Sequence, residues 1–291
     1  GYTDPELGIP VYSHYGEHRK PSPEMLKNVE VLFVDLQDVG ARYYTFIWTL
    51  FLCMDACEKQ GIPVVVLDRP NPINCVDEEG PILDLGYTSF VGLHSIPVRH
   101  GKTIGELARL FKAERFPSCE LYVMEMENYD KRMWFDETGL PWVMPSPNMP
   151  TLDTAIVYPG MCLLEATNVS EGRGTTRPFE IFGAPFIDAE KLCRYMNGLK
   201  LPGVLFRENY FQPTFHKGAG SICGGAQIHV LDRNVFRSFD MTIKLLQYLF
   251  HEYPNDFAWK APPYEYEFEK LPIDILLGSG TFRKEFIESG L

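Results

Sequence analysis

The stretch from Glu165 to Glu180, EATNVSEGRGTTRPFE, carries the densest set of chemically capable side chains in this sequence. It mixes carboxylates, arginines, hydroxyls and an amide, and it is too polar for a core element and too glycine-rich for a stable helix. Gly172 and Gly174 flank Arg173, so the backbone can approach a ligand while the guanidinium presents a planar fork to a carboxylate. We predict a functional loop here. The alternative is a solvated loop with an internal ion pair between Glu171 and an arginine.

A second group of polar side chains follows two apolar runs, at positions 31–34 and 62–67. Runs that are apolar on both faces predict strands buried between helix layers of a parallel sheet, and such sheets bind ligands at the carboxyl ends of their strands. The polar residues at these ends are Asp35, Asp38, Asp68, Arg69 and Asn71. The aspartates are candidates for acid–base chemistry or cation binding, and the alternative is that they form turns and caps.

His100 is a further candidate. It lies between Arg99 and Gly101, where it is either a catalytic base or a hydrogen-bonded loop histidine. His94 and His100 do not have the spacing of a zinc site, and no metal or organic cofactor is expected. The sequence contains neither GxGxxG, nor GxSxG, nor a P-loop, which argues against a dinucleotide enzyme, a common serine hydrolase and a P-loop NTPase.

Helical and strand patterns supply the elements that would position these groups. Helices are predicted after the first strand, with Tyr44, Ile47 and Trp48 on one face, and at 103–116, 188–198 and 234–251. Further strands are predicted at 121–126, 204–207 and 226–231. We predict an α/β protein with a Rossmann-like parallel-sheet domain at 1–146 and a smaller α+β domain at 147–291. The proline-rich segment 137–150 forms the junction, and the site lies in the cleft between the domains.

Composition restricts the possible partners. The chain has 291 residues, 45% of them hydrophobic, and a formal net charge of -12. That charge argues against binding to nucleic acid or to an anionic membrane surface, and no stretch is apolar for long enough to span a membrane. The seven cysteines lack CxxC pairs and are expected to be reduced, structural thiols. The sequence does not predict an oligomeric state.

Several segments in a fixed order resemble the exo-β-N-acetylmuramidase family, long catalogued as a bacterial domain of unknown function. They run from about Gly8 to the end of the chain, and the most specific are DLQDVGARYYTFIWTL, VVVLDRPNPI, IPVRHGKTIGELA, GLPWVMPSPNMPT, EATNVSEGRGTTRPFE and FQPTFHK. The resemblance implies a peptidoglycan-recycling glycosidase that removes N-acetylmuramic acid from the non-reducing end of amino-sugar oligosaccharides. It also implies an extracytoplasmic location, either periplasmic or secreted. The family carries a PEHG-type segment with a proposed catalytic glutamate, and no residue here matches it. We therefore expect the first domain to be truncated at its amino end.

This chemistry assigns provisional roles to the candidate residues. Glu171 is the first choice for a catalytic carboxylate, with Asp38 and Asp35 next. Arg173, and after it Arg69, would bind the lactyl carboxylate of muramic acid. The remaining substrate-binding candidates are Asp68, Asn71, His100, Asn148 and Asn168, with Tyr44 or Trp142 stacking on a sugar ring. Two alternatives remain open: a non-catalytic cell-wall sugar-binding protein, and a metal-dependent hydrolase that uses Asp35, Asp38 and Asp68.

Overall fold

The predicted parallel sheet is present in the computed structural model, which describes residues 1–14 and 18–289. It consists of β3 (Leu32–Val34), β4 (Val64–Leu67) and β5 (Leu121–Met124), in the order β3-β4-β5. Among the described strands β4, and not the first strand, is therefore the central one. The mixed α/β class predicted from the sequence is confirmed.

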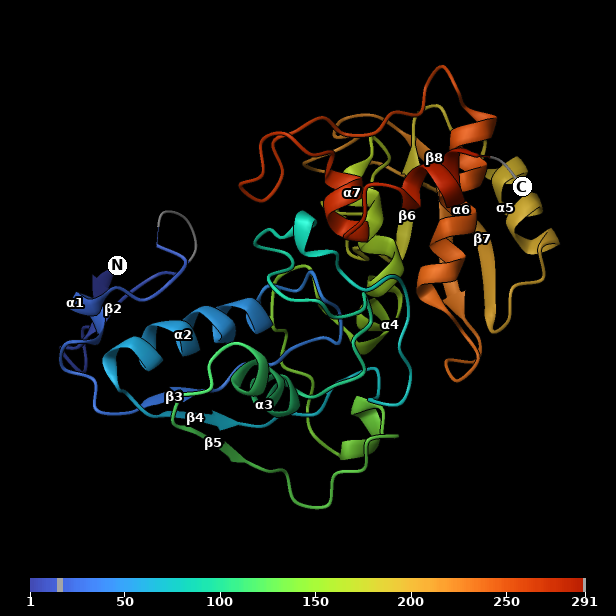
Figure 1. The fold of residues 1–291 in the computed structure, drawn as a ribbon. Helices are drawn as coiled ribbons and strands as arrows, with labels where there is room; N and C mark the ends of the chain where they lie inside the picture. Colours follow the sequence, from blue (N-terminus) through green and yellow to red (C-terminus); the bar gives the residue numbers. More distant parts are fainter. Residues whose placement is uncertain (15–17, 290–291) are drawn as a thin grey trace.

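Two helices cover this sheet, α2 (Phe46–Gln60) and α3 (Ile104–Glu114) (Figure 1). They pack on the face that carries Val34, Val64 and Val66, all of them buried. The expectation that the strands are buried on both faces is wrong for the described residues. Both helices lie on the same side of the sheet, so side chains on the other face are exposed, among them Phe33, Tyr122 and Met124.

Local signals explain where these helices begin and end. At the start of the helix predicted from residue 103, Thr103 and Glu106 form a capping box, in which each side chain accepts a hydrogen bond from the backbone N–H of the other residue. Helix α2 ends at Gly61, whose φ of 65° is the left-handed conformation that glycine adopts readily at a helix end. Both helices therefore have termini that the sequence encodes locally.

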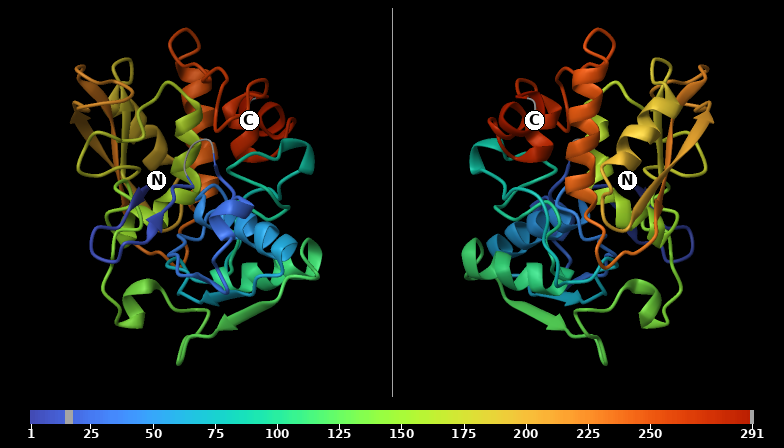
Figure 2. Two further views of the ribbon diagram at one scale, coloured as in Figure 1. Left: turned by 90° about the vertical axis from the view of Figure 1, so that its left-hand side faces the viewer. Right: turned by 90° about the vertical axis from the view of Figure 1, so that its right-hand side faces the viewer.

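The second half of the chain contains an antiparallel sheet with helices around it (Figure 2). Its strands are β6 (Ile181–Ala184), β7 (Val204–Phe211) and β8 (Cys223–Val230), in the order β6-β8-β7. The helices are α4 (Leu152–Met161), α5 (Ala189–Gly198), α6 (Ser238–Glu252) and α7 (Pro272–Leu277). The smaller elements are β1 (Tyr2–Thr3), β2 (Pro10–Val11), α1 (Pro23–Leu26), η1 (Leu85–Tyr87), η2 (Phe135–Thr138), η3 (Cys162–Ala166) and η4 (Lys284–Glu288).

Sequence patterns did not predict α4, β6 or α7. Helix α4 contains Pro159, and a proline inside a segment argues against a helix because it removes a backbone donor. Here the proline lies only two residues before the end of the helix at Met161, so most of the helix precedes it. Strand β6 has only four residues and is buried throughout, so it has no alternating pattern to detect. Each of these elements depends on tertiary packing more than on a local signal.

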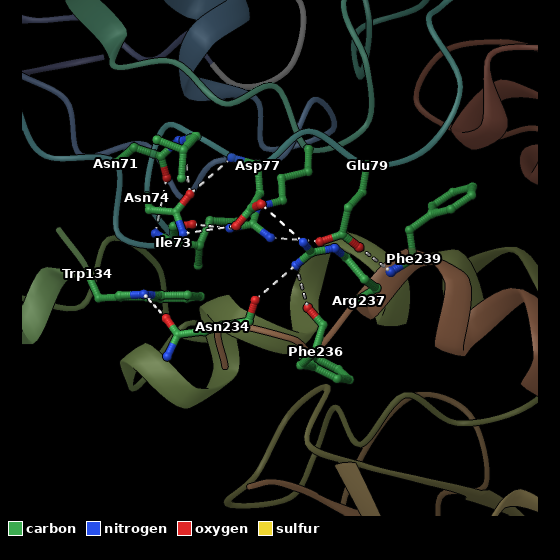
Figure 3. A network of polar contacts seen from close by, with 12 residues as sticks. Asn71, Ile73, Asn74, Asp77, Glu79, Trp134, Asn234, Phe236, Arg237 and Phe239 are labelled. Carbon is green, nitrogen blue, oxygen red and sulfur yellow. Dashed lines mark hydrogen bonds and ion pairs between the residues drawn. The ribbon is translucent and has the colours of Figure 1, made fainter. Parts of the chain in front are cut away.

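A buried polar junction connects the two halves (Figure 3). The Glu79 carboxylate accepts hydrogen bonds from Arg99 at 2.7 Å and from the backbone N–H of Phe239, at the start of α6, at 2.9 Å. Arg237 donates to Asp77 at 3.1 Å across the same boundary. Nearby, one hydrophobic core draws residues from both halves. These contacts bring the first half against the start of α6.

All seven cysteines are free, and all but the half-buried Cys75 are buried. This agrees with the predicted structural role. In the described parts of the chain, no helix is long and apolar enough to cross a membrane.

Candidate active site

The polar loop predicted around Glu171 follows η3 and is held tightly by its backbone. Ser170 pairs with Gly183 of β6, with N–H···O distances of 2.9 and 3.0 Å. Gly172 has a φ of 82°, and a Cβ atom there would lie 2.6 Å from the Ile181 carbonyl oxygen. Only glycine fits at this position. The turn therefore fixes the direction of Glu171 and Arg173 on either side of it.

Glu171 is buried, with 3% of its surface exposed, and its carboxylate lies between two cations. Lys217 Nζ lies 2.5 Å from Oε2, and Arg173 Nε lies 3.3 Å from Oε1. Lys217 also donates to the Leu164 carbonyl oxygen at 2.7 Å. Burial lowers the pKa of Lys217, while the neighbouring Glu171 opposes that shift. The buried negative charge of Glu171 is therefore compensated at close range.

Arg173 is already engaged by protein groups. Its Nη2 donates to Glu165 Oε1 at 2.6 Å, its Nε faces Glu171, and its guanidinium lies 5.2 Å from the centre of the Phe179 ring. Burial lowers the pKa of Arg173, but Glu165 and its other anionic neighbours outweigh burial and raise the pKa overall. The fork predicted to bind a substrate carboxylate is thus occupied by Glu165 and Glu171.

A second segment, 260–267, completes the site. The Tyr264 hydroxyl donates to Glu165 Oε2 at 2.9 Å, and Tyr264 and Glu267 exchange backbone hydrogen bonds of 2.9 Å. Burial raises the pKa of Tyr264, with Glu165 adding to the shift, so this hydroxyl remains a donor. Lys260 and Glu265 of this segment line the same cavity as Glu171.

These groups line one cavity of about 550 Å³, a size typical of small-molecule sites. Its walls combine carboxyl groups, cations and neutral polar groups. They are Glu165, Glu171, Glu265, Arg173, Lys217, Lys260, His216, Thr167, Asn168, Tyr264 and Pro263. Of the sequence-predicted site residues, the cavity brings together Glu171, Arg173 and Asn168. Asn168 holds the wall through hydrogen bonds to the backbone of Asp256 at 2.7 Å and Ala258 at 3.0 Å.

Asp35 and Arg69 lie in a different hollow, at the carboxyl ends of the parallel strands. It measures about 670 Å³, and Asp68, Tyr129 and Leu140 are among its lining residues. Arg69 Nε donates to Asp35 Oδ1 at 2.5 Å, and both side chains are partly exposed. The Arg69 hydrogen bond lowers the pKa of Asp35, and partial burial opposes that shift. This hollow shares no lining residue with the cavity around Glu171.

Asp68 has mainly structural contacts. Its carboxylate accepts hydrogen bonds from the Thr103 hydroxyl at 2.9 Å and from the Gly105 N–H at 2.8 Å, at the start of α3. Burial raises the pKa of Asp68, and these hydrogen bonds oppose the shift. The aspartate therefore joins the end of β4 to the first turn of α3.

Asp38, His100 and Asn71 are buried behind these strand ends. His100 Nε2 lies 3.0 Å from Asp38 Oδ2, which also accepts a hydrogen bond from Gly40 N–H at 2.7 Å. The Asn71 amide bonds to the backbone of Lys102 and Ile73 at 3.0 and 3.2 Å. These contacts agree with the alternative of a hydrogen-bonded loop histidine.

The metal-hydrolase alternative required Asp35, Asp38 and Asp68 to converge on one ion. Over residues 1–14 and 18–289, no group of three or more His, Cys, Asp or Glu side chains could hold a metal ion. Instead each aspartate has its own partner: Arg69, His100 or the start of α3. The geometry therefore does not fit that alternative.

Tyr44 and Asn148 line neither hollow. Tyr44 is buried, with its ring 4.9 Å from that of Phe46 and 6.0 Å from that of Tyr158, so it packs in the core instead of offering a face to a sugar. Asn148 is half-buried in the proline-rich segment. The indole of Trp142 donates to the Met149 carbonyl oxygen at 3.2 Å within that segment.

The sequence interpretation gave no role to Glu165, Lys217, Lys260, Tyr264 or Glu265. Lys217 ends the FQPTFHK segment, and Glu265 lies in the run YEYEF, where acids alternate with aromatic residues. Those patterns were available as signals. What the sequence did not show is that segments 165–173, 216–217 and 260–265 meet at one cavity.

Two family models match this chain. The family model described as exo-beta-N-acetylmuramidase NamZ, N-terminal, matches residues 1–153, and the corresponding C-terminal model matches residues 156–290. The chain belongs to the exo-β-N-acetylmuramidase NamZ family. The resemblance inferred from the motifs is confirmed.

A relative from Bacillus subtilis (strain 168) is named peptidoglycan beta-N-acetylmuramidase NamZ. It is 48% identical over 289 residues, which cover 99% of this chain and 68% of the relative. Two crystal structures of DUF1343 family proteins from Bacteroides fragilis NCTC 9343 are also similar. The first has a TM-score of 0.89 at 36% identity, and the match covers 98% of this chain and 74% of the Bacteroides chain. The second has a TM-score of 0.77 at 29% identity, with coverages of 99% and 74%.

Proposed function

We propose that this protein is an exo-acting glycosidase that releases N-acetylmuramic acid from the non-reducing end of peptidoglycan fragments. Its place in the NamZ family and the activity named for its Bacillus subtilis relative support this proposal. The observation that links this function to particular residues is the cavity around Glu171, which is lined by both carboxyl groups and cations. Hydrolysis of a glycosidic bond commonly requires a pair of carboxyl groups near the anomeric carbon.

Glu171 is the carboxylate we assign to the anomeric carbon. Positive charge develops there as the glycosidic bond breaks, and a fixed negative charge nearby stabilises it. Lys217 and Arg173 hold the Glu171 side chain in place at 2.5 and 3.3 Å. Because both cations are anchored by other contacts, the carboxylate needs little reorganisation when the sugar binds.

Muramic acid also carries a lactyl carboxylate, which requires a cation. We assign this role to Lys260 in place of Arg173, because Glu165 and Glu171 already occupy the Arg173 fork. Lys260 lines the same cavity, is exposed, and has no ion pair among the residues placed by the structure; its Nζ lies 5.5 Å from the centre of the Tyr264 ring. A substrate carboxylate could therefore pair with it directly.

The proposed substrate also suggests where the protein works. Peptidoglycan lies outside the cytoplasm, so we propose that this protein meets its amino-sugar oligosaccharides in the periplasm or after secretion. Fractionation of the producing cells, with the protein detected by antibody, would test this location. Its recovery in the cytoplasmic fraction alone would contradict it.

The function itself is tested with two disaccharides. MurNAc-β-1,4-GlcNAc carries the lactyl group on the non-reducing sugar, whereas GlcNAc-β-1,4-GlcNAc lacks it. We expect release of free N-acetylmuramic acid from the first, detected by chromatography, and no cleavage of the second. Binding of the first disaccharide without release would instead favour a sugar-binding protein, and equal cleavage of both would contradict the proposed specificity.

A further inference from the structure

Glu265 differs from the other carboxyl groups of the Glu171 cavity in its contacts. Glu165 accepts hydrogen bonds from Arg173 and Tyr264, and Glu171 pairs with Lys217 and Arg173. Glu265 lines the same cavity, yet its carboxyl group has no hydrogen bond or ion pair within the described parts of the chain. It is therefore the carboxyl group left free to contact a ligand.

The backbone at this position is strained. Glu265 has a φ of 45° and Tyr266 a φ of 67°, both in the left-handed region, although neither is glycine. A non-glycine residue in this conformation is unfavourable and persists only where surrounding contacts enforce it. Here the Tyr264 hydroxyl is bonded to Glu165, and the Arg19 guanidinium lies 4.2 Å from the centre of the Tyr266 ring. The contacts on both sides hold Glu265 at the cavity wall.

The surroundings of Glu265 favour its protonated form. Burial raises its pKa, and the negative charge of Glu165 adds to the shift, whereas Lys260, Arg173 and Arg19 oppose it. Glu171, in the same cavity, lies directly between two cations. Two carboxyl groups with such different surroundings are suited to different roles, one as proton donor and the other as fixed charge.

We propose that Glu265 is the proton donor to the glycosidic oxygen of the bound substrate. This inference rests on the proposed glycosidase function. It assigns the second catalytic carboxyl group, beside Glu171. The bond from C1 to the glycosidic oxygen breaks, its electron pair stays on that oxygen, and the oxygen takes the proton of Glu265. A water molecule then supplies oxygen to C1, and the proton it releases restores Glu265.

The test compares two substrates with different leaving groups. Cleavage of MurNAc-GlcNAc releases GlcNAc, whose O4 must gain a proton as it leaves, whereas 4-nitrophenyl β-N-acetylmuraminide releases a stable phenolate without one. We expect Glu265→Gln to lower kcat/KM for the disaccharide by roughly 100-fold or more and to leave the nitrophenyl substrate within a few-fold of wild type. Glu269→Gln changes an exposed acid shortly after the 260–267 segment; it serves as the matched control and should resemble wild type on both substrates.

The pH profile gives a second readout. Wild-type kcat for the disaccharide should fall on the alkaline side, where Glu265 loses its proton, and this limb should be absent from Glu265→Gln. Equal losses on both substrates, or no loss on either, would overturn the role of Glu265. If the wild-type protein cleaves neither substrate, the glycosidase function itself fails. That outcome is distinguishable because it does not depend on the variant.

Discussion

Two sets of acidic residues in this molecule show how differently carboxyl groups can be used. Asp35, Asp38 and Asp68 follow the strands of the parallel sheet, where ligand sites are expected, yet each is bound to a different structural partner. Glu165 and Glu171 belong to one polar loop and Glu265 to a segment far along the chain, yet all three line a single cavity. The comparison teaches that a carboxylate at a strand end is only a candidate. Convergence on one cavity, where one member has no partner among the described residues, is the stronger indication of chemistry.

The largest effect is expected at Glu171. The change Glu171→Gln keeps the shape of the side chain but removes the charge that Lys217 and Arg173 surround. We expect kcat on MurNAc-GlcNAc to fall by roughly 1,000-fold, with disaccharide affinity kept within about tenfold, because the lost interaction acts mainly on the transition state. Steady-state kinetics and calorimetric titration measure the two quantities. Full activity in this variant would remove Glu171 from the mechanism.

Asp68 should behave in the opposite way, with an effect on stability and none on chemistry. Asp68→Ala removes the hydrogen bonds from the Thr103 hydroxyl and the Gly105 N–H, and it should lower the free energy of unfolding by about 1–3 kcal/mol. Urea unfolding measures the change, and the folded variant should keep wild-type kcat/KM. A large loss of activity at unchanged stability would move catalysis to the strand ends.

Lys260 tests how the cavity selects its sugar. We expect Lys260→Met to raise KM for MurNAc-GlcNAc about tenfold, because it removes a charge-assisted contact to the lactyl group. The matched control is the same disaccharide with its lactyl carboxyl group methylated, for which wild type and variant should have similar KM values. If the variant weakens both substrates equally, Lys260 does not recognise the carboxylate.

The smallest effect is expected at Asp35. Its pKa is lowered by Arg69 from the ordinary value of 3.8, so the ion pair adds stability above pH 3.8 and loses it as the pH falls through the lowered value. Since solvent reaches both side chains and screens the pair, Asp35→Asn should cost less than about 1 kcal/mol at pH 7. Urea unfolding at pH 7 and at pH 2.5 should show a small difference that shrinks with acid. A difference that grows with acid would contradict the assigned pair.

Much of the first half of the fold was predictable because its signals are local. The apolar runs predicted β3 and β4, a strand was predicted where β5 lies, and the helix predicted from residue 103 is α3. Helix α4 was missed because Pro159 lies within it. The sequence also predicted helices on both faces of the parallel sheet, whereas α2 and α3 cover only one. An apolar run does not reveal on which side the helices pack.

The candidate site was predictable only in part. Glycines around Arg173 indicated a functional loop, and the structure places Glu171 and Arg173 in the wall of a cavity. The sequence could not show that Arg173 is neutralised by Glu165, nor that Glu265 is held on a strained backbone next to them. The first fact depends on how the loop folds Arg173 back onto Glu165, and the second depends on Tyr264, which bonds to Glu165 from the far end of the chain.

The location of bound substrate is the most direct test of this account. The measurement is a crystal structure of the Glu171→Gln variant, which should bind the disaccharide without cleaving it, soaked with MurNAc-GlcNAc. We predict the muramic acid ring in the cavity around position 171, with its lactyl carboxylate near Lys260 and the glycosidic oxygen facing Glu265. Disaccharide bound instead in the hollow of Asp35 and Arg69, with the cavity around position 171 empty, would contradict the account.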